Sequence, residues 1–75
     1  MYTRPVSDRL MHRIVTNLPG GKLTLEALRE RTAHRMGLPV GRVYLRGVLN
    51  SDQTADYWLE GKPSEIQTVL DKYVF

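Results

Sequence analysis

The chain has 75 residues, no cysteine and a formal net charge of +3. This length fits one small domain with a thin core, and the lack of cysteine excludes a disulfide framework, a thiolate nucleophile and a sulfur-ligated zinc site. No apolar run approaches the ~20 residues that span a bilayer, and the N-terminus lacks the apolar core of a signal peptide, so we expect a cytoplasmic protein without a membrane partner.

The charge is unevenly distributed along the chain. Residues 1–46 hold nine Lys and Arg against three acids, whereas residues 47–75 hold two against five. A basic half of this kind indicates an acidic partner, either nucleic acid, with DNA favoured, or an acidic protein surface. The alternative is an uneven surface that is merely solvated.

The first expected element is a helix. Residues 1–6, MYTRPV, precede any periodic pattern and are expected to form a flexible tail, so the globular domain spans residues 7–75. Ser7 is a typical N-cap, and the helix from about 8 to 18 buries one apolar stripe. The stripe consists of Leu10, Met11, Ile14, Val15 and Leu18. Pro19, Gly20 and Gly21 end the helix and turn the chain.

A second helix is expected from Thr24, as its cap, to about Met36, with Gly37 as its terminator. The last segment opens at Pro63 or Ser64 and predicts a C-terminal helix. Its apolar positions are Ile66, Val69, Leu70, Tyr73 and Val74.

The segment 42–60 is predicted to be a two-stranded antiparallel hairpin, because one register satisfies both faces. Pairing residues whose numbers sum to 102 places charged and aromatic pairs on one face. They are Arg42 with Glu60, Tyr44 with Trp58, Arg46 with Asp56 and Val48 with Thr54. On the other face Val43 meets Leu59, Leu45 meets Tyr57 and Gly47 meets Ala55. The expected three-residue loop is Asn50, Ser51 and Asp52.

Read as a helix instead, the same region resembles part of the small winged-helix transcription regulators. Ala33, Met36, Gly37, Leu38 and Val43 fit the slots of a helix-turn-helix unit, GGKLTLEAL is similar to the entry of the second helix, and ADYWLEG to a wing strand. This resemblance covers residues 8–61 and implies DNA binding.

A second resemblance is to acylphosphatase-like, ferredoxin-type folds. MGLPVGRVYLRGV followed by YWLEGKPSEIQTVL is similar to their later helix, hairpin and helix over residues 28–73. The stretch VTNLPGGK has no arginine where the family's phosphate loop needs one, so no activity is carried over.

The chemistry of the sequence favours binding over catalysis. Arg9 and Arg13 are four residues apart, as are Arg31 and Arg35, and like charges at this spacing repel within a helix. We therefore expect them to contact phosphate or clustered carboxylates of a partner. No set of residues has the spacing of a catalytic or metal site, so we expect a non-enzymatic protein without cofactor, metal or small-molecule substrate.

The sequence thus predicts a small single α+β domain with two N-terminal helices, a hairpin over about 42–60 and a C-terminal helix, of which a winged-helix arrangement is one variant. The first expected function is a nucleic-acid-binding regulatory protein, for which DNA is favoured. Its contact residues would be Arg9, Arg13, Arg31, Arg35, Arg42, Tyr44 and Arg46. The alternative is a protein-interaction module, an inhibitor or adaptor that docks through Tyr44 and Trp58. A homodimer is compatible with both functions.

Overall fold

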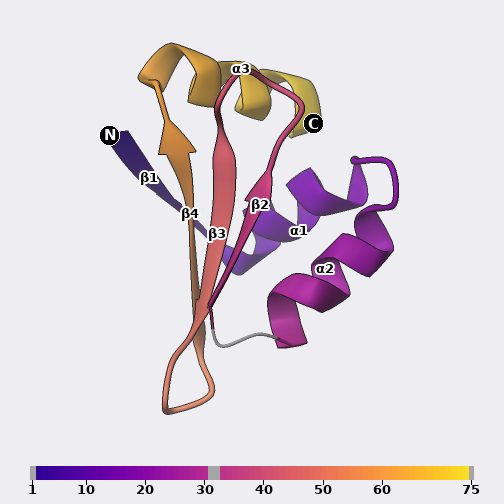
Figure 1. Cartoon of the computed structure of the whole chain (residues 1–75), viewed down its shortest axis with the longest axis vertical. Helices are drawn as coiled ribbons and strands as arrows, with labels where there is room; N and C mark the ends of the chain where they lie inside the picture. The colour runs from indigo at the N-terminus through magenta and orange to yellow at the C-terminus, as the bar shows by residue number, and fades with distance from the viewer. Residues whose placement is uncertain (1, 31–32, 75) are drawn as a thin grey trace.

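The computed structural model describes residues 2–30 and 33–74, which form a four-stranded antiparallel sheet and three helices (Figure 1). The elements are β1 (Tyr2–Val6), α1 (Asp8–Thr16), α2 (Gly21–Glu30), β2 (Ala33–Gly37), β3 (Tyr44–Leu49), β4 (Ala55–Gly61) and α3 (Pro63–Tyr73). The strand order is β1-β4-β3-β2, so the first and last strands of the chain are neighbours. The prediction of a small α+β domain is confirmed, but the sheet has four strands where a two-stranded hairpin was expected.

Helix α1 begins and packs as its sequence predicts. The Ser7 hydroxyl accepts a hydrogen bond of 3.1 Å from the Leu10 amide, which satisfies one of the free donors of the first turn. Met11, Ile14 and Val15 are fully buried. At the other end the side-chain amide of Asn17 donates to the Tyr73 carbonyl oxygen at 2.7 Å and ties α1 to the end of α3.

The turn between α1 and α2 depends on its two glycines. Gly20 adopts a φ of 70°, in the left-handed region that glycine enters at little cost. Gly21 then starts α2 so close to the Val15 carbonyl group that any Cβ atom would overlap it. The helix therefore begins at Gly21, and Thr24, the expected N-cap, lies inside it with its hydroxyl donating to the Gly20 carbonyl oxygen.

The prediction of a second helix reaching Met36 is wrong. Helix α2 ends at Glu30, and Ala33–Gly37 forms β2, which pairs antiparallel with β3. Leu25 and Leu28 are buried helical residues, whereas Met36 lies opposite Leu45 in the sheet. The helical spacing seen in the sequence thus ran across two different elements, α2 and β2. Residues 33–37 are extended because they pair with β3, and local periodicity cannot reveal such a partner strand.

The central hairpin of β3 and β4 is confirmed, but its predicted register is wrong. Arg46 lies opposite Trp58, Leu45 opposite Leu59 and Gly47 opposite Tyr57, so the paired numbers sum to 104. A shift of two residues keeps every side chain on its predicted face, because side chains alternate with a period of two. The segment that a winged-helix protein would use as a recognition helix is therefore strand β3.

The hairpin loop explains the shift. The Asn50 amide donates to the Thr54 carbonyl oxygen at 2.7 Å, so the loop is Ser51, Asp52 and Gln53, one residue later than expected. Gln53 takes the left-handed position with a φ of 70°. The Asp52 carboxylate accepts hydrogen bonds from the Thr54 amide at 3.1 Å and its hydroxyl at 2.6 Å, which fixes the turn.

Residues 2–6, for which we expected a flexible tail, form the edge strand β1 instead. They pair antiparallel with β4, from Tyr2 opposite Gly61 to Val6 opposite Tyr57. Pro5 has no amide hydrogen and is therefore suited to an edge strand. The side chain of Val6 is 8% exposed and packs in the core, which anchors β1 to the rest of the fold.

The three helices cover one face of the sheet, with α1 and α2 beside the strands and α3 at the end where β4 leaves it (Figure 1). Helix α3 follows Lys62 with Pro63 in its first turn, as predicted, and buries Ile66, Val69, Leu70 and Tyr73. The core lies between the helices and this face. Its other members are Val6, Met11, Ile14, Val15, Leu25, Leu28, Leu38, Val43, Leu45, Tyr57 and Leu59.

Candidate interaction surface

Within residues 2–30 and 33–74 no helix covers the opposite face of the sheet, which we call the open face (Figure 1). Leu45 and Leu59 point into the core, so the residues that alternate with them along the strands point away from it. Residues directly opposite on neighbouring strands share a face, which extends this assignment to β1 and β2. The open face carries Thr3, Pro5, Arg35, Tyr44, Arg46, Val48, Asp56, Trp58 and Glu60.

A hydrogen-bonded group of three side chains occupies the middle of the open face. One oxygen of Glu60 accepts a hydrogen bond of 2.9 Å from the Trp58 indole nitrogen and lies 3.5 Å from a guanidinium nitrogen of Arg46. The Arg46 guanidinium stands over the Trp58 ring, 5.5 Å from its centroid. These contacts hold the indole in one orientation, so a partner that covers it loses little side-chain entropy on binding.

The ion pair in this group is only partly shielded from solvent. The side chain of Glu60 is 12% exposed and that of Arg46 is 37% exposed. The Nε atom of Arg46 is buried without a hydrogen-bond partner among the described residues. A buried donor without an acceptor is unfavourable. A partner that supplies an acceptor for this nitrogen would therefore gain binding free energy from the new hydrogen bond.

A second aromatic residue lies beside the first group. The guanidinium carbon of Arg35 lies 4.4 Å from the centroid of the Tyr44 ring, within the range of a cation–π interaction. Arg35 is also directly opposite Arg46 across the β2–β3 ladder, where like charges repel. The ion pair found among residues 2–30 and 33–74 belongs to Arg46, so the charge of Arg35 faces solvent.

Charges of opposite sign on the open face are separated by strand. Both acids, Asp56 and Glu60, lie on β4, whereas Arg46 lies on β3 and Arg35 on β2. A groove of about 810 Å³ lies along β1, β4 and the residues that follow β1, lined by both acids together with Pro5 and Trp58. The open face is thus acidic and grooved along one side, basic along the other and aromatic between them.

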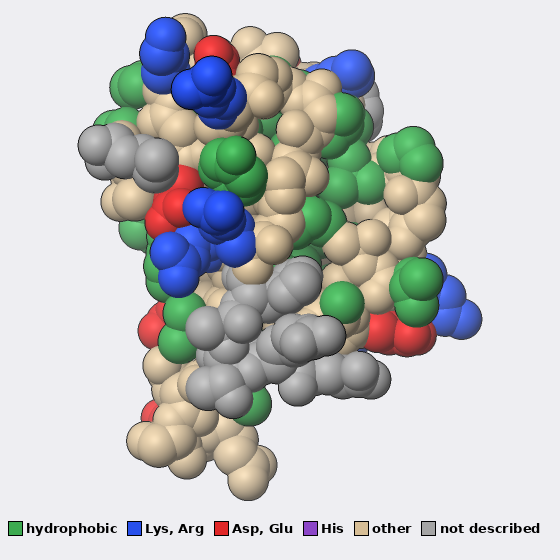
Figure 2. All heavy atoms as spheres, in the orientation of Figure 1, with side chains coloured by type: hydrophobic (Ala, Val, Ile, Leu, Met, Phe, Trp, Pro, Cys, Tyr) green, Lys and Arg blue, Asp and Glu red, His purple; other side chains and the backbone are tan. Residues whose placement is uncertain are grey.

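The arginines predicted to line the N-terminal helices are only partly placed there. Arg9 and Arg13 lie exposed on α1, as expected. Arg35 lies on β2, which corrects its assignment to a helix, and Arg31 lies outside the described residues. On the face in view in Figure 2, Lys and Arg side chains form separate groups with hydrophobic and acidic side chains between them. The predicted double row of arginines on two helices is therefore not formed.

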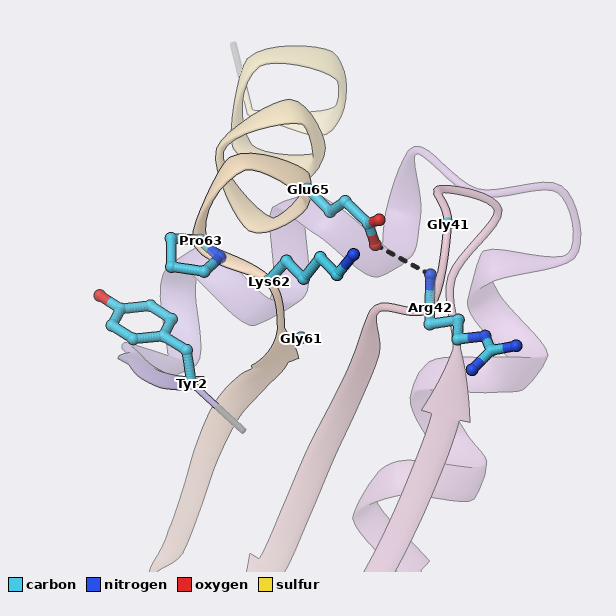
Figure 3. A pocket seen from close by; sticks show the side chains of 7 residues that line it. All are labelled: Tyr2, Gly41, Arg42, Gly61, Lys62, Pro63 and Glu65. Atoms are coloured by element: carbon cyan, nitrogen blue, oxygen red, sulfur yellow. Dashed lines mark hydrogen bonds between the residues drawn. The ribbon is translucent and has the colours of Figure 1, made fainter.

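Arg42, the remaining predicted contact residue, lies in the turn before β3, beside the start of α3. Its backbone amide donates to the Glu65 carboxylate at 3.0 Å, which links this turn to the start of α3 (Figure 3). A shallow pocket of about 490 Å³ lies here, with Tyr2 and Lys62 among its lining residues. Glu65 lines the same pocket and adds negative charge to it, so this pocket is a weaker anion site than the charges of Arg42 and Lys62 suggest.

Two titratable groups near the hairpin have shifted pKa values. The hydrogen bond from the Thr54 hydroxyl, together with that from its amide, lowers the pKa of Asp52. Burial raises the pKa of Tyr57, and the negative charge of Asp8 acts in the same direction. Asp52 lies in the hairpin loop and Tyr57 lies in the core, so neither group is on the open face.

The aromatic residues of the open face were predicted from the sequence, but two of their contacts were not. The stacking of Arg35 on Tyr44 requires β2, which was taken for helix. The groove beside Trp58 requires β1, which was taken for a tail. The alternation of Arg42, Tyr44, Arg46 and Val48 did contain the usable signal, since polar and aromatic residues at every second position indicate a sheet face that no helix covers.

No family model matches this chain, and searches of curated proteins and of solved structures find no match either. Within the part of the chain that the structure describes, no three His, Asp or Glu side chains come together as a metal site would require. The helices in the same part lack the length and apolar character needed to cross a membrane.

Proposed function

We propose that this protein is a non-enzymatic protein-interaction module that docks on another protein through its open face. The observation that carries this proposal is that Trp58 and Tyr44 lie diagonal to each other on neighbouring strands of the open face, each with an arginine over its ring. Trp, Tyr and Arg are the residues most enriched among those that dominate binding energy in protein interfaces.

The charge balance of the open face favours a protein partner over a phosphate backbone. Two arginines are offset by two acids, and Glu60 pairs directly with Arg46. A nucleic-acid surface depends mainly on uncompensated Lys and Arg, whereas a protein interface joins an aromatic centre to charges of both signs. The partner that fits has an apolar patch for the two rings and a carboxylate within reach of Arg35.

The experiment is affinity capture from the cells that produce the chain, followed by titration calorimetry with the purified partner. Trp58→Ala and Tyr44→Ala remove the two rings, and Leu23→Ala is the matched control because Leu23 is an apolar residue of α2 that is 74% exposed. We expect each ring variant to weaken binding at least ~10-fold, as for residues that dominate an interface, and the control to bind as the wild type does. Equal affinities for all four proteins would refute the proposal.

Nucleic-acid binding is the second candidate, and the position of Arg35 beside Arg46 favours it. Bases stack on exposed aromatic rings while arginines contact the phosphates, and this mode suits single strands on an open sheet. Arg9, Arg13 and Arg42 would add phosphate contacts from other surfaces. A DNA-binding regulator of the winged-helix kind would belong to this candidate, but it needs a recognition helix in the segment that forms β3.

Trp58 reports directly on this second candidate, because it is the one tryptophan of the chain. Single-stranded and duplex oligonucleotides are titrated against the wild type and Arg35→Ala while the indole emission is recorded. Stacking predicts quenching by single strands, an affinity that falls with salt and a shallower salt dependence in the variant. Unchanged emission at low salt would exclude a base-stacking role for the open face.

A further inference from the structure

The separation of charge on the open face makes this surface complementary to itself. Both acids lie on β4, and the two arginines lie on the neighbouring strands β3 and β2. A second copy turned to face the first can therefore set β3, which carries Arg46, over β4 of the first, where Asp56 and Glu60 flank Trp58 along the strand, and receive the reverse contacts in return. An interface of this kind uses the same patch on both subunits and closes after two copies.

We propose that two copies of this chain pair through their open faces, with a two-fold axis parallel to the strands and above the junction of β3 and β4. This inference rests on the proposed function, because it names the partner of the same surface. The axis places β3 of each copy over β4 of the other and β2 over the β1 edge, so Arg46 faces the row that contains Trp58. A two-fold axis perpendicular to the strands would instead place β4 over β4 and bring the acids together.

The aromatic residues fit this arrangement as well as the charges do. Pro5, Trp58, Arg46 and Arg35 form one continuous row across the four strands. Rotation about the proposed axis brings this row over its own copy in the opposite direction, so each Trp58 meets Arg46 of the other copy. Sheets that pack face to face lie ~10 Å apart, a separation that the two layers of Arg and Trp side chains span.

The size of the open face sets the expected affinity. Four strands spaced ~4.8 Å apart, with a rise of ~3.3 Å per residue over their length, present a face of about 400 Å². This is about half of what each partner of a standard stable interface buries. We therefore expect a reversible dimer with a dissociation constant on the order of 10 to 100 µM.

The test is sedimentation of the full chain at concentrations from about 1 to 300 µM, a range that brackets the expected constant. Arg35→Glu places an acid diagonal to Asp56 and Glu60 of the other copy, and Asp56→Arg places a cation next to the row that holds Arg46 of the other copy, both at exposed positions. Lys22→Glu and Asp71→Arg make the same charge changes at exposed positions on helices, away from the open face. Circular dichroism of each variant verifies the fold before sedimentation.

We expect the wild type and both helix variants to dimerise as the concentration rises. Arg35→Glu and Asp56→Arg should each weaken self-association at least ~10-fold, and an equimolar mixture of the two should recover part of it through the restored opposite charges. A wild type that stays monomeric throughout, or charge variants that dimerise as well as the wild type, would overturn the inference.

The same experiments separate this inference from the proposed function. If the wild type is monomeric while Trp58→Ala abolishes binding of a captured heterologous partner, only the self-pairing inference fails. If the wild type dimerises but Trp58→Ala and the two charge variants dimerise equally well, the open face is not the dimer interface and the self-pairing inference fails, whereas the proposed function is still decided by the affinity of Trp58→Ala for a heterologous partner.

Discussion

The Glu60 carboxylate holds the Trp58 indole in place through a hydrogen bond of 2.9 Å between two side chains of the same strand. The same oxygen pairs with Arg46, so one acid organises the centre of the open face. We expect Glu60→Ala to lower the free energy of unfolding by about 1–2 kcal/mol, because it leaves two donors without their acceptor.

Glu60→Gln is the matched control for this variant, since it keeps an acceptor oxygen and removes only the charge. It should cost less than Glu60→Ala, about 1 kcal/mol or below. Urea denaturation measures both variants. A loss of the same size in the two variants would show that the charge of Glu60, and not its hydrogen bonding, stabilises the group.

The hairpin loop provides a prediction about stability that is independent of function. Gln53 has a φ of 70°, a conformation that costs a residue with a Cβ atom about 1 kcal/mol and glycine much less. Gln53→Gly should therefore leave stability unchanged or raise it by up to about 1 kcal/mol. Ser51→Gly, in the same loop without a left-handed φ, should lower stability by a few tenths of a kcal/mol because it only makes the unfolded chain more flexible. Thermal unfolding of the two variants compares them directly, and a larger loss for Gln53→Gly would contradict the loop position.

This loop also shows why the register was not predictable from the sequence. Asn50, Ser51 and Asp52 are turn-forming residues and Gln53 is not, so composition favours a loop that begins one residue earlier than the observed one. The side chain of Thr54 favours the observed loop by donating to Asp52, and a contact of this kind is visible only in three dimensions. Which side chains share a face was predictable, because a shift by two residues preserves it.

The two edge strands were missed for a similar reason. Helices α1 and α3 each carry a full apolar stripe that determines their conformation locally. Strand β1 has a single buried side chain, Val6, and most of its stabilisation comes from backbone pairing with β4. Strand β2 likewise depends on pairing with β3. As a result the aromatic half of the candidate site was predictable, whereas its groove and the position of Arg35 were not.

The turn that carries Arg42 supplies a third prediction. Gly41 has a φ of 51°, and a Cβ atom there would collide with the Glu65 carboxylate, which accepts the Arg42 amide hydrogen bond. Gly41→Ala should destabilise the fold by about 1–2 kcal/mol through backbone strain and displacement of this carboxylate. Gly37→Ala is the control, because its Cβ atom would meet only the Tyr44 ring at an ordinary 3.7 Å. Urea denaturation should show little change for the control, and equal losses in both variants would contradict this account of the turn.

The stability of the protein at alkaline pH depends on Tyr57. Burial, and secondarily the charge of Asp8, raises the pKa of Tyr57 above its ordinary value of 10.0. A group whose pKa is raised in the folded state contributes stability that is complete below its ordinary pKa and is lost as the pH rises through the folded value. The wild type should therefore lose more stability than Tyr57→Phe as the pH rises above about 10. Urea denaturation at several alkaline pH values, with tyrosinate absorbance recorded in parallel, tests this, and parallel losses would contradict it.

The most direct test of the open face as an interface is the accessibility of Trp58, the single tryptophan of the chain. Acrylamide quenching of its fluorescence is measured for the dilute protein, for the protein at high concentration and for the complex with a captured partner. We expect quenching to fall by at least ~2-fold on association, together with a shift of the emission to shorter wavelength, because an interface centre excludes water from its anchor residues. Quenching that stays unchanged while sedimentation shows that a complex has formed would mean that binding uses another surface.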